Sequence, residues 1–141
     1  MTEQLIHATA IALNGKAVLL CGPPGSGKSD LALRAIEGRA VLIADDQTRL
    51  HRAGDLLLAS CPESIRGRLE VRGIGIVAMP MRDRVPVVLA VDLVSSVDVE
   101  RMPEYDSRDY MGISIPLLRL APFEASALAK LRLAVARLAG E

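Results

Sequence analysis

Aromatic side chains are nearly absent from this chain of 141 residues. They make up 2% of the sequence, and tryptophan does not occur. Half of the residues are nevertheless hydrophobic, so leucine, valine, isoleucine and alanine can fill a core without aromatic rings. A chain of this length suits one domain, and we expect a single domain over residues 1–141.

Net charge is also missing. Lysine and arginine together number 17, as do aspartate and glutamate, so the formal charge is zero. This balance gives no general electrostatic reason to expect a nucleic acid partner. Lysine itself is scarce and occurs only as Lys16, Lys28 and Lys130.

The sequence gives little evidence for disulfides, a signal peptide or a membrane-spanning segment. Cys21 and Cys61 lack the spacing of a metal site, which favours free thiols in a reducing compartment. The start of the chain lacks the apolar core of a signal peptide. The most apolar stretch, residues 85–94, contains Pro86 and Asp92 and is too short to cross a bilayer. We therefore expect a cytoplasmic protein with no membrane partner.

One motif dominates the sequence: Gly22-Pro23-Pro24-Gly25-Ser26-Gly27-Lys28-Ser29 matches the phosphate-binding pattern G-x-x-x-x-G-K-[ST] at every fixed position. The apolar residues 17–21 before it indicate a buried strand, and residues 29–37 after it have the pattern of a helix. Glycines let backbone N–H groups point at phosphate oxygens, and the helix N-terminus adds partial positive charge. Lys28 would reach the outer phosphates and Ser29 would face Mg²⁺. The sequence therefore predicts binding of a nucleoside triphosphate.

The remaining elements follow from local patterns. Asn14-Gly15 separates two strand-like runs, 9–13 and 16–21, and predicts a hairpin that places the second run beside an antiparallel neighbour at the N-terminal edge. A helix is predicted at the C-terminus, with Pro122 in its first turn and a stripe formed by Leu128, Leu131, Val135 and Leu138. We also expect strands at 41–44, 50–51, 56–58, 87–93 and 113–120, short apolar segments at 69–71 and 74–79, and a helical turn at 62–66.

Two groups of charged residues could join the motif in chemistry. Asp45 and Asp46 follow the strand predicted at 41–44, and ligands of open α/β sheets lie beyond the carboxyl ends of strands. Strand side chains alternate between faces, so we expect one of the two acids to face the phosphates. Glu70 and Arg72 are two apart and would share one face of a strand, where they could hold a metal and a phosphoryl oxygen; a surface ion pair is the alternative.

These residues carry a resemblance to a known family. The order of His7, residues 22–29, Ala44-Asp45-Asp46 and Leu69-Glu70-Val71-Arg72-Gly73-Ile74-Gly75-Ile76 resembles HPr kinase/phosphorylase, whose signature reads E-[IV]-R-G-[LI]-G-I. The resemblance covers nearly the whole chain, strongly over 7–79 and weakly beyond. It implies an α/β P-loop kinase domain of the HPr kinase and phosphoenolpyruvate carboxykinase type, with a mixed sheet and flanking helices. It further implies the catalytic C-terminal domain alone, without an N-terminal regulatory domain.

The resemblance also implies an activity and roles for residues. The family phosphorylates a serine of HPr, a small phosphocarrier of the phosphotransferase system, and many members also remove that phosphate by phosphorolysis. By this resemblance Lys28 and the loop hold the phosphates of ATP, Ser29 and Glu70 ligate Mg²⁺, and Asp46 accepts the serine proton with His7 beside it. Arg108, in Tyr105-Asp106-Ser107-Arg108, is similar to the catalytic arginine of the family's YDR segment with one residue inserted; an exposed loop arginine is the alternative. Members assemble into hexamers, so a homo-oligomer is one expectation.

One departure from the family pattern bears on activity. The family's PGRN loop, tied to phosphorolysis and to gripping the partner, is replaced by Pro122-Phe123-Glu124-Ala125. We hypothesise that kinase activity is retained and phosphorylase activity is reduced or lost. Two other readings stay open: a small-molecule kinase, for which Arg82-Asp83-Arg84 could be a short lid, and a non-catalytic nucleotide sensor.

Overall fold

The computed structural model describes residues 2–138. Within them the chain forms strands, two α-helices and two short 3-10 turns, η1 (Glu63–Ile65) and η2 (Ser96–Asp98). The helices are α1 (Lys28–Glu37) and α2 (Ala127–Leu138). The strands are β1 (Glu3–Ile6), β2 (Ala8–Leu13), β3 (Lys16–Cys21), β4 (Val41–Ala44), β5 (Thr48–Ala53), β6 (Leu56–Ser60), β7 (Arg68–Val71), β8 (Gly75–Ala78), β9 (Val85–Leu93), β10 (Ser107–Tyr110) and β11 (Ile113–Leu120).

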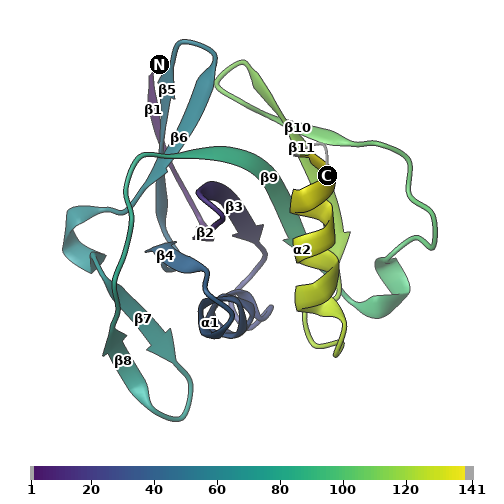
Figure 1. Ribbon diagram of the computed structural model, residues 1–141, viewed down its shortest axis with the longest axis horizontal. Coiled ribbons are helices and arrows are strands. Elements are labelled where there is room, and N and C mark those ends of the chain that lie inside the picture. The colour runs from purple at the N-terminus through teal and green to yellow at the C-terminus, as the bar shows by residue number, and fades with distance from the viewer. Residues whose placement is uncertain (1, 139–141) are drawn as a thin grey trace.

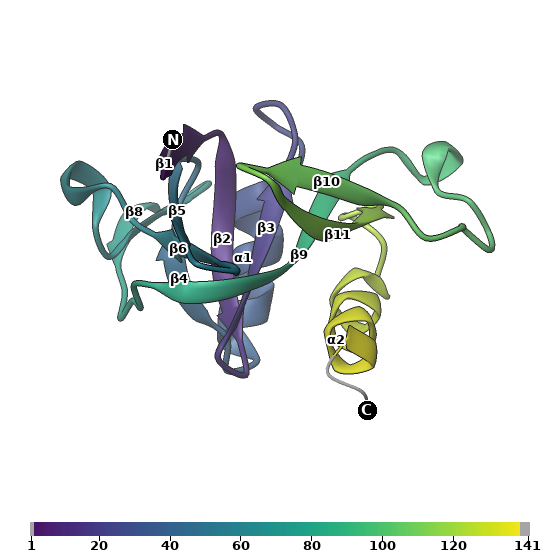
Figure 2. The same cartoon turned by 90° about the horizontal axis from the view of Figure 1, so that it is seen from above.

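Strand β3 lies inside a mixed sheet. It pairs with β2 in an antiparallel hairpin and with β9 in parallel, and β9 pairs in parallel with β11 on its other side. The hairpin turn uses Asn14 at φ 52° and Gly15 at φ 77°, the positive angles that its sequence predicted. The sheet runs in the order β1-β5-β6-β9-β3-β2-β4, and it curls so that its outer strands fold over its centre (Figure 2).

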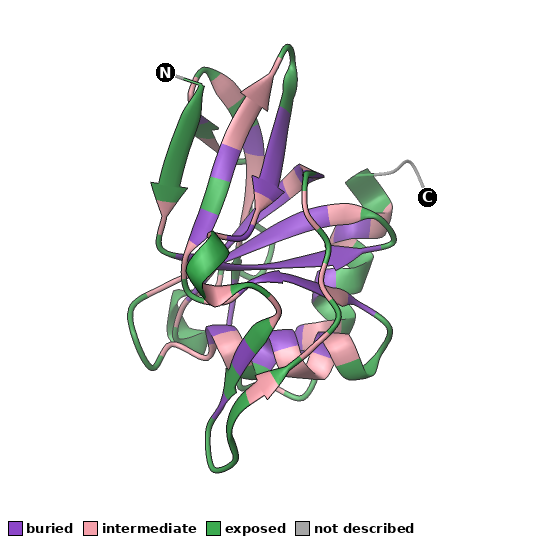
Figure 3. Ribbon diagram, turned by 90° about the vertical axis from the view of Figure 1, so that its left-hand side faces the viewer, coloured by how far each residue is buried: buried purple, intermediate pink, exposed green. Residues whose placement is uncertain are grey.

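Alternation along β3 builds the two sides of the core. Val18 and Leu20 pack toward α1 and α2, whereas Ala17 and Leu19 pack toward the curled strands β5 and β6. Both helices therefore cover one face of the central strands, as Figure 1 shows. The most buried strands run between the helices and the outer strands (Figure 3). This arrangement removes aliphatic side chains from water on both faces without needing aromatic rings.

A two-stranded hairpin, β7–β8, lies outside the main sheet. Its Leu69 and Val71 are buried with Leu42 of β4, and Leu33 and Ile36 of α1 pack against them. Figure 1 shows the hairpin extending beside α1. This packing holds the strand that contains Glu70 next to β4 and α1.

The expected α/β class with a mixed sheet and flanking helices is confirmed, but four local expectations change. Strands β1 and β10 were not predicted, since each has only four residues and contains polar side chains. Strand β2 is not at an edge, because β4 pairs with its free side. Pro122 lies ahead of α2 rather than in its first turn, because residues 122–126 form turns before the helix begins at Ala127. Leu138 is exposed, whereas Leu128 is partly buried and packs against the cluster that contains Ala127, Leu131 and Val135.

No helix among residues 2–138 is long and apolar enough to cross a membrane.

We expect Leu131→Ala to destabilise the fold by about 2–5 kcal/mol, because it removes a fully buried side chain between α2 and the sheet. Leu133→Ala makes the same substitution on the exposed side of the same helix and should change the free energy of unfolding by no more than about 0.5 kcal/mol. Urea unfolding of both variants measures the difference. Equal losses in the two variants would contradict the placement of α2.

Candidate active site

The motif predicted to bind phosphate forms a glycine-rich loop, residues 22–27, between the end of β3 and the start of α1. The Ser26 N–H donates to the carbonyl of Pro23, which closes a turn. Gly27 has φ +98°, and a Cβ at this position would lie 3.0 Å from Cζ of Phe123. A side chain there would therefore strain the backbone and press against the segment that precedes α2. Glycine at this position lets the two segments touch.

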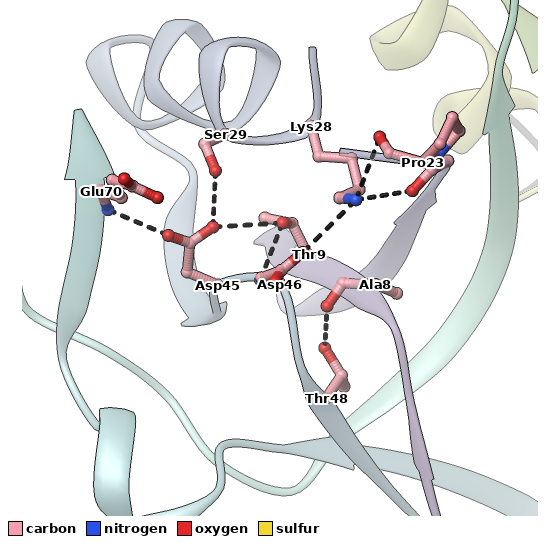
Figure 4. Close-up of polar contacts among 10 residues, drawn as sticks. Ala8, Thr9, Pro23, Lys28, Ser29, Asp45, Asp46, Thr48 and Glu70 are labelled. Atoms are coloured by element: carbon pink, nitrogen blue, oxygen red, sulfur yellow. Dashed lines mark hydrogen bonds and ion pairs between the residues drawn. The ribbon is translucent and has the colours of Figure 1, made fainter. Parts of the chain in front are cut away.

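Lys28 begins α1 and folds its side chain back over the loop (Figure 4). Its Nζ donates to the carbonyl oxygen of Gly22 at 2.6 Å and lies 3.4 Å from Oδ1 of Asp46. The lysine side chain is only 7% exposed, whereas that of Asp46 is 65% exposed. One buried cation is thus held between the loop and an accessible carboxylate.

Asp45 connects three elements at the same place. Its Oδ1 accepts hydrogen bonds from Oγ of Ser29 at 2.6 Å and from Oγ1 of Thr9 at 3.2 Å, and its Oδ2 accepts one from the N–H of Glu70 at 2.9 Å. Figure 4 shows these bonds converging on one carboxylate. The donors come from α1, β2 and β7, so Asp45 fixes the position of each relative to the others.

Both neighbouring acids contact the motif, although strand alternation predicted that one would face it. Asp45 bonds to Ser29, and Asp46 pairs with Lys28. The reason is that β4 ends at Ala44, so the two acids lie in a bend where alternation no longer applies. Asp46 has φ +66°, a left-handed conformation that aspartate tolerates better than most residues.

Glu70 lies near this cluster, but Arg72 does not share its strand. The N–H of Glu70 bonds to Asp45 while its side chain is exposed. Strand β7 ends at Val71, so Arg72 falls in the following turn and the predicted shared strand face is wrong. Within residues 2–138 there is no group of three or more His, Cys, Asp or Glu side chains arranged to hold a metal ion.

His7 occupies an exposed bend between β1 and β2. Ile6 pairs with Thr48, and Oγ1 of Thr48 donates to the carbonyl of Ala8 at 2.8 Å. These two contacts hold the bend beside the start of β5, two residues after Asp46. Among the described residues, no hydrogen bond or ion pair involves the His7 side chain, so its predicted role beside Asp46 stays a prediction.

Arg108 lies on strand β10, so the alternative of an exposed loop arginine is wrong. Its guanidinium makes two hydrogen bonds to Asp92, of 2.9 and 2.7 Å. Asp92 is paired in register with Cys21, the last residue before the glycine-rich loop. The bonds to Asp92 raise the pKa of Arg108 above its ordinary value, so the arginine stays charged. Sequence reasoning considered Asp92 only as a break in an apolar run.

Two further groups around this pair have shifted pKa values. Burial raises the pKa of Tyr110 to about 12. Burial, followed by the negative charge of Asp92, also raises the pKa of the Cys21 thiol. Both groups therefore stay protonated at neutral pH, and the Asp92–Arg108 pair carries the charge in this part of the protein.

The segment Arg82-Asp83-Arg84, considered above as a lid, is tied to the sheet. The N–H of Arg82 donates to the carbonyl of Leu42, and the N–H of Arg84 donates to Oγ of Ser60, both at 2.9 Å. Asp83 accepts a hydrogen bond from the N–H of Cys61 and pairs with Arg66. These bonds oppose the movement that a lid requires.

The residue types around the loop suit an anionic phosphate group and a hard cation. The hydroxyl oxygen of Ser26 is buried and has no hydrogen-bond partner among the described residues, and a Cβ on Gly22 would lie 2.5 Å from it. Lys28 supplies the positive charge. Ser29 and Asp45 supply oxygen atoms of the kind that Mg²⁺ prefers.

Fold comparison defines the class of protein. The solved structure of the Hpr(Ser) kinase/phosphatase from Coxiella burnetii is similar to this chain with a TM-score of 0.84 and 26% sequence identity, over 96% of this chain and 97% of that one. The family model of the HPr Serine kinase C-terminal domain matches residues 1–136. The chain therefore belongs to the HPr serine kinase C-terminal domain family, which confirms the resemblance seen in the sequence.

Curated relatives agree with this assignment. The HPr kinase/phosphorylase of Alkaliphilus metalliredigens is 34% identical over 110 residues, which are 77% of this chain and 36% of that protein. That of Prosthecochloris aestuarii is 32% identical over 129 residues, which are 83% of this chain and 38% of that protein. The chain thus spans less than half the length of these relatives.

Tyr110 provides a pH test of this region. Its pKa of about 12 in the folded protein lies above the ordinary value of about 10 that it regains on unfolding. The folded state then holds the proton more tightly, so stability should fall as pH rises between these two values. In a Tyr105→Phe variant Tyr110 is the remaining tyrosine, and tyrosinate absorbance reports its pKa.

The control is the same titration in denaturant, with circular dichroism to confirm that the fold persists in the native sample. An ordinary midpoint in the folded protein would contradict the burial of Tyr110.

Proposed function

We propose that this chain binds ATP with Mg²⁺ at residues 22–29 and transfers the γ-phosphoryl group to a serine of an HPr-type phosphocarrier. The observation that carries the proposal is the 3.4 Å pair of Lys28 and Asp46 at the mouth of the glycine-rich loop. It places a cation suited to phosphate beside a carboxylate suited to a hydroxyl proton. Membership of the HPr serine kinase C-terminal domain family supports the choice of acceptor.

Phosphoryl transfer depends mainly on positioning and on charge stabilisation. ATP, when bound, supplies the phosphoryl group, and Mg²⁺ offsets its negative charge. On this proposal the N–H groups of residues 22–27 and Nζ of Lys28 hold the phosphates. Ser29 and Glu70 would hold the cation, with Asp45 orienting both through its bonds to the Ser29 hydroxyl and the Glu70 N–H.

Asp46 is the proposed base. Its side chain is exposed enough to meet a serine presented by another protein. Its backbone N–H donates to Oγ1 of Thr9 at 3.0 Å, which fixes the residue while leaving the carboxylate accessible. His7 and Arg108 are proposed as further members of the site, with Asp92 positioning Arg108. Assembly of this chain into a homo-oligomer is a separate prediction.

Asp46→Asn should lower kcat by at least about 100-fold, because it removes the proton acceptor. ATP should still bind, since asparagine keeps the size and tolerates the left-handed backbone of residue 46. Mass spectrometry of purified HPr after incubation with ATP and Mg²⁺ measures transfer, and calorimetry measures ATP binding. Asp55→Asn, on the exposed turn between β5 and β6, is the matched control.

Each result of this experiment points to one conclusion. Wild-type turnover in Asp46→Asn would show that the base assignment is wrong. Transfer to nucleosides and not to HPr would identify a small-molecule kinase. ATP binding without transfer to any protein would identify a nucleotide sensor.

Phosphorolysis should be much slower than the kinase reaction. The family's PGRN loop carries an arginine where this chain has Glu124, so a cation is exchanged for an anion. Lys130 and Ser96 hydrogen-bond to Glu124 and lower its pKa, which keeps it ionised. Because Glu124 pairs with Lys130 and replaces the arginine, residues 122–125 offer no cation to hold inorganic phosphate. Pyrophosphate release from serine-phosphorylated HPr, compared with forward transfer by the same preparation, tests this; equal rates would contradict it.

A further inference from the structure

A pocket of about 520 Å³ opens beside the glycine-rich loop. Its walls come from the ends of β9 and β11, through Leu93, Val94 and Ala121, and from Pro122 and Phe123 before α2. Ser26 of the loop also lines it. Ser95, Ser96 and Glu124 complete the lining, so apolar and polar side chains both face the pocket. The volume lies within the range of small-molecule sites, about 300–1,000 Å³.

The pocket and the acidic residues lie on opposite sides of the loop. On one side of β3 the sheet continues through β2 to β4. Asp45 and Asp46 directly follow β4. The pocket lies on the other side, beyond the ends of β9 and β11, which continue the sheet from β3 in the opposite direction. A nucleotide whose phosphates lie on the loop, with the terminal one toward Asp46, would therefore extend its nucleoside toward the pocket.

Phe123 is exposed, although aromatic side chains are scarce in this chain. It is the only phenylalanine of the chain, yet its side chain is 72% exposed and contributes little to the core. The ring lies against Gly27. Arg34 of α1 hydrogen-bonds to the carbonyl of Pro122, and Glu124 is held by Ser96 and Lys130. The residues on both sides of Phe123 are thus held in place while its ring remains exposed to a ligand.

Ser26 gives the pocket an unused polar group. Its hydroxyl oxygen is buried and has no hydrogen-bond partner among residues 2–138. A buried hydroxyl without a partner carries a free-energy cost, which a ligand that supplies the missing partner would relieve.

We infer that this pocket binds the nucleoside of the nucleotide, with the base stacked on Phe123. Aromatic stacking is tolerant of the base, and an exposed, anchored ring loses little freedom on binding. The inference rests on the proposed function, because it takes the phosphates to lie on residues 22–29. It assigns nucleoside recognition to the segment that replaces the family's PGRN loop.

The test compares a nucleotide with its phosphates alone. Calorimetry with Mg²⁺-ATP and with Mg²⁺-tripolyphosphate is performed on the wild type, Phe123→Ala and Phe123→Trp. Phe123→Ala should weaken ATP binding roughly ten- to a hundredfold and change tripolyphosphate binding by less than about twofold, because stacking acts on the base alone. Phe123→Trp should retain ATP affinity. Tyr105→Ala, a similarly exposed aromatic side chain outside the pocket, should leave both affinities unchanged.

The outcomes separate this inference from the proposed function. Unchanged ATP affinity in Phe123→Ala, or equal loss of both ligands, would overturn the nucleoside site. ATP binding that depends on Phe123, without phosphoryl transfer to HPr, would support the nucleoside site and overturn the kinase proposal. If neither ligand binds the wild type, both the nucleoside site and the kinase proposal are wrong.

Discussion

The carboxylate of Asp45 is the contact on which the candidate site depends. It accepts hydrogen bonds from Ser29, from Thr9 and from the backbone of Glu70, so α1, β2 and β7 meet at one charged group. Bonds to a charged acceptor are stronger than those between neutral groups, and each donor would be left unpaired by its loss. The position of the helix that carries Lys28 is therefore coupled to the hairpin that carries Glu70.

Thr9 extends this contact into a closed circuit. Its fully buried hydroxyl donates to Asp45 and accepts from the N–H of Asp46, whose carboxylate then pairs with Lys28, the neighbour of Ser29. The circuit returns to its start through the first two residues of α1. Asp46 has a left-handed backbone, and its N–H donates to Thr9 in that conformation. The bonds from Thr9 and Lys28 together hold residue 46 in this less common backbone conformation.

The sequence predicted correctly those elements that depend on residues close together in the chain. The hairpin at Asn14-Gly15 requires positive φ at two residues that favour it, and the helix after the glycine-rich loop begins within one residue of its predicted start. The pairing of Arg108 with Asp92 was not accessible in this way. The two residues lie on β10 and β9, strands that both pair with β11, a long-range arrangement that spacing along the chain does not encode. Strand β10 itself is too short and polar to show a period.

The role of Asp45 escaped prediction for a different reason. Its position beside Asp46 was visible, but the strand rule assigns the two acids to opposite faces only while the strand continues. Here β4 stops at Ala44, and the backbone turns both side chains toward the first residues of α1. Which acid bonds to Ser29 and which to Lys28 is then set by the Thr9 hydroxyl, a long-range contact that no spacing along the chain encodes.

The charges of this circuit constrain how a nucleotide could bind. Two carboxylates, Asp45 and Asp46, face one ammonium, Lys28, so the three side chains together carry a negative charge. A nucleotide arriving alone would meet repulsion from Asp46, which the loop N–H groups and the helix N-terminus offset only in part. A divalent cation reverses the sign of the local charge. Under the proposed function, nucleotide and Mg²⁺ binding are therefore coupled, and each should strengthen the other by the same factor.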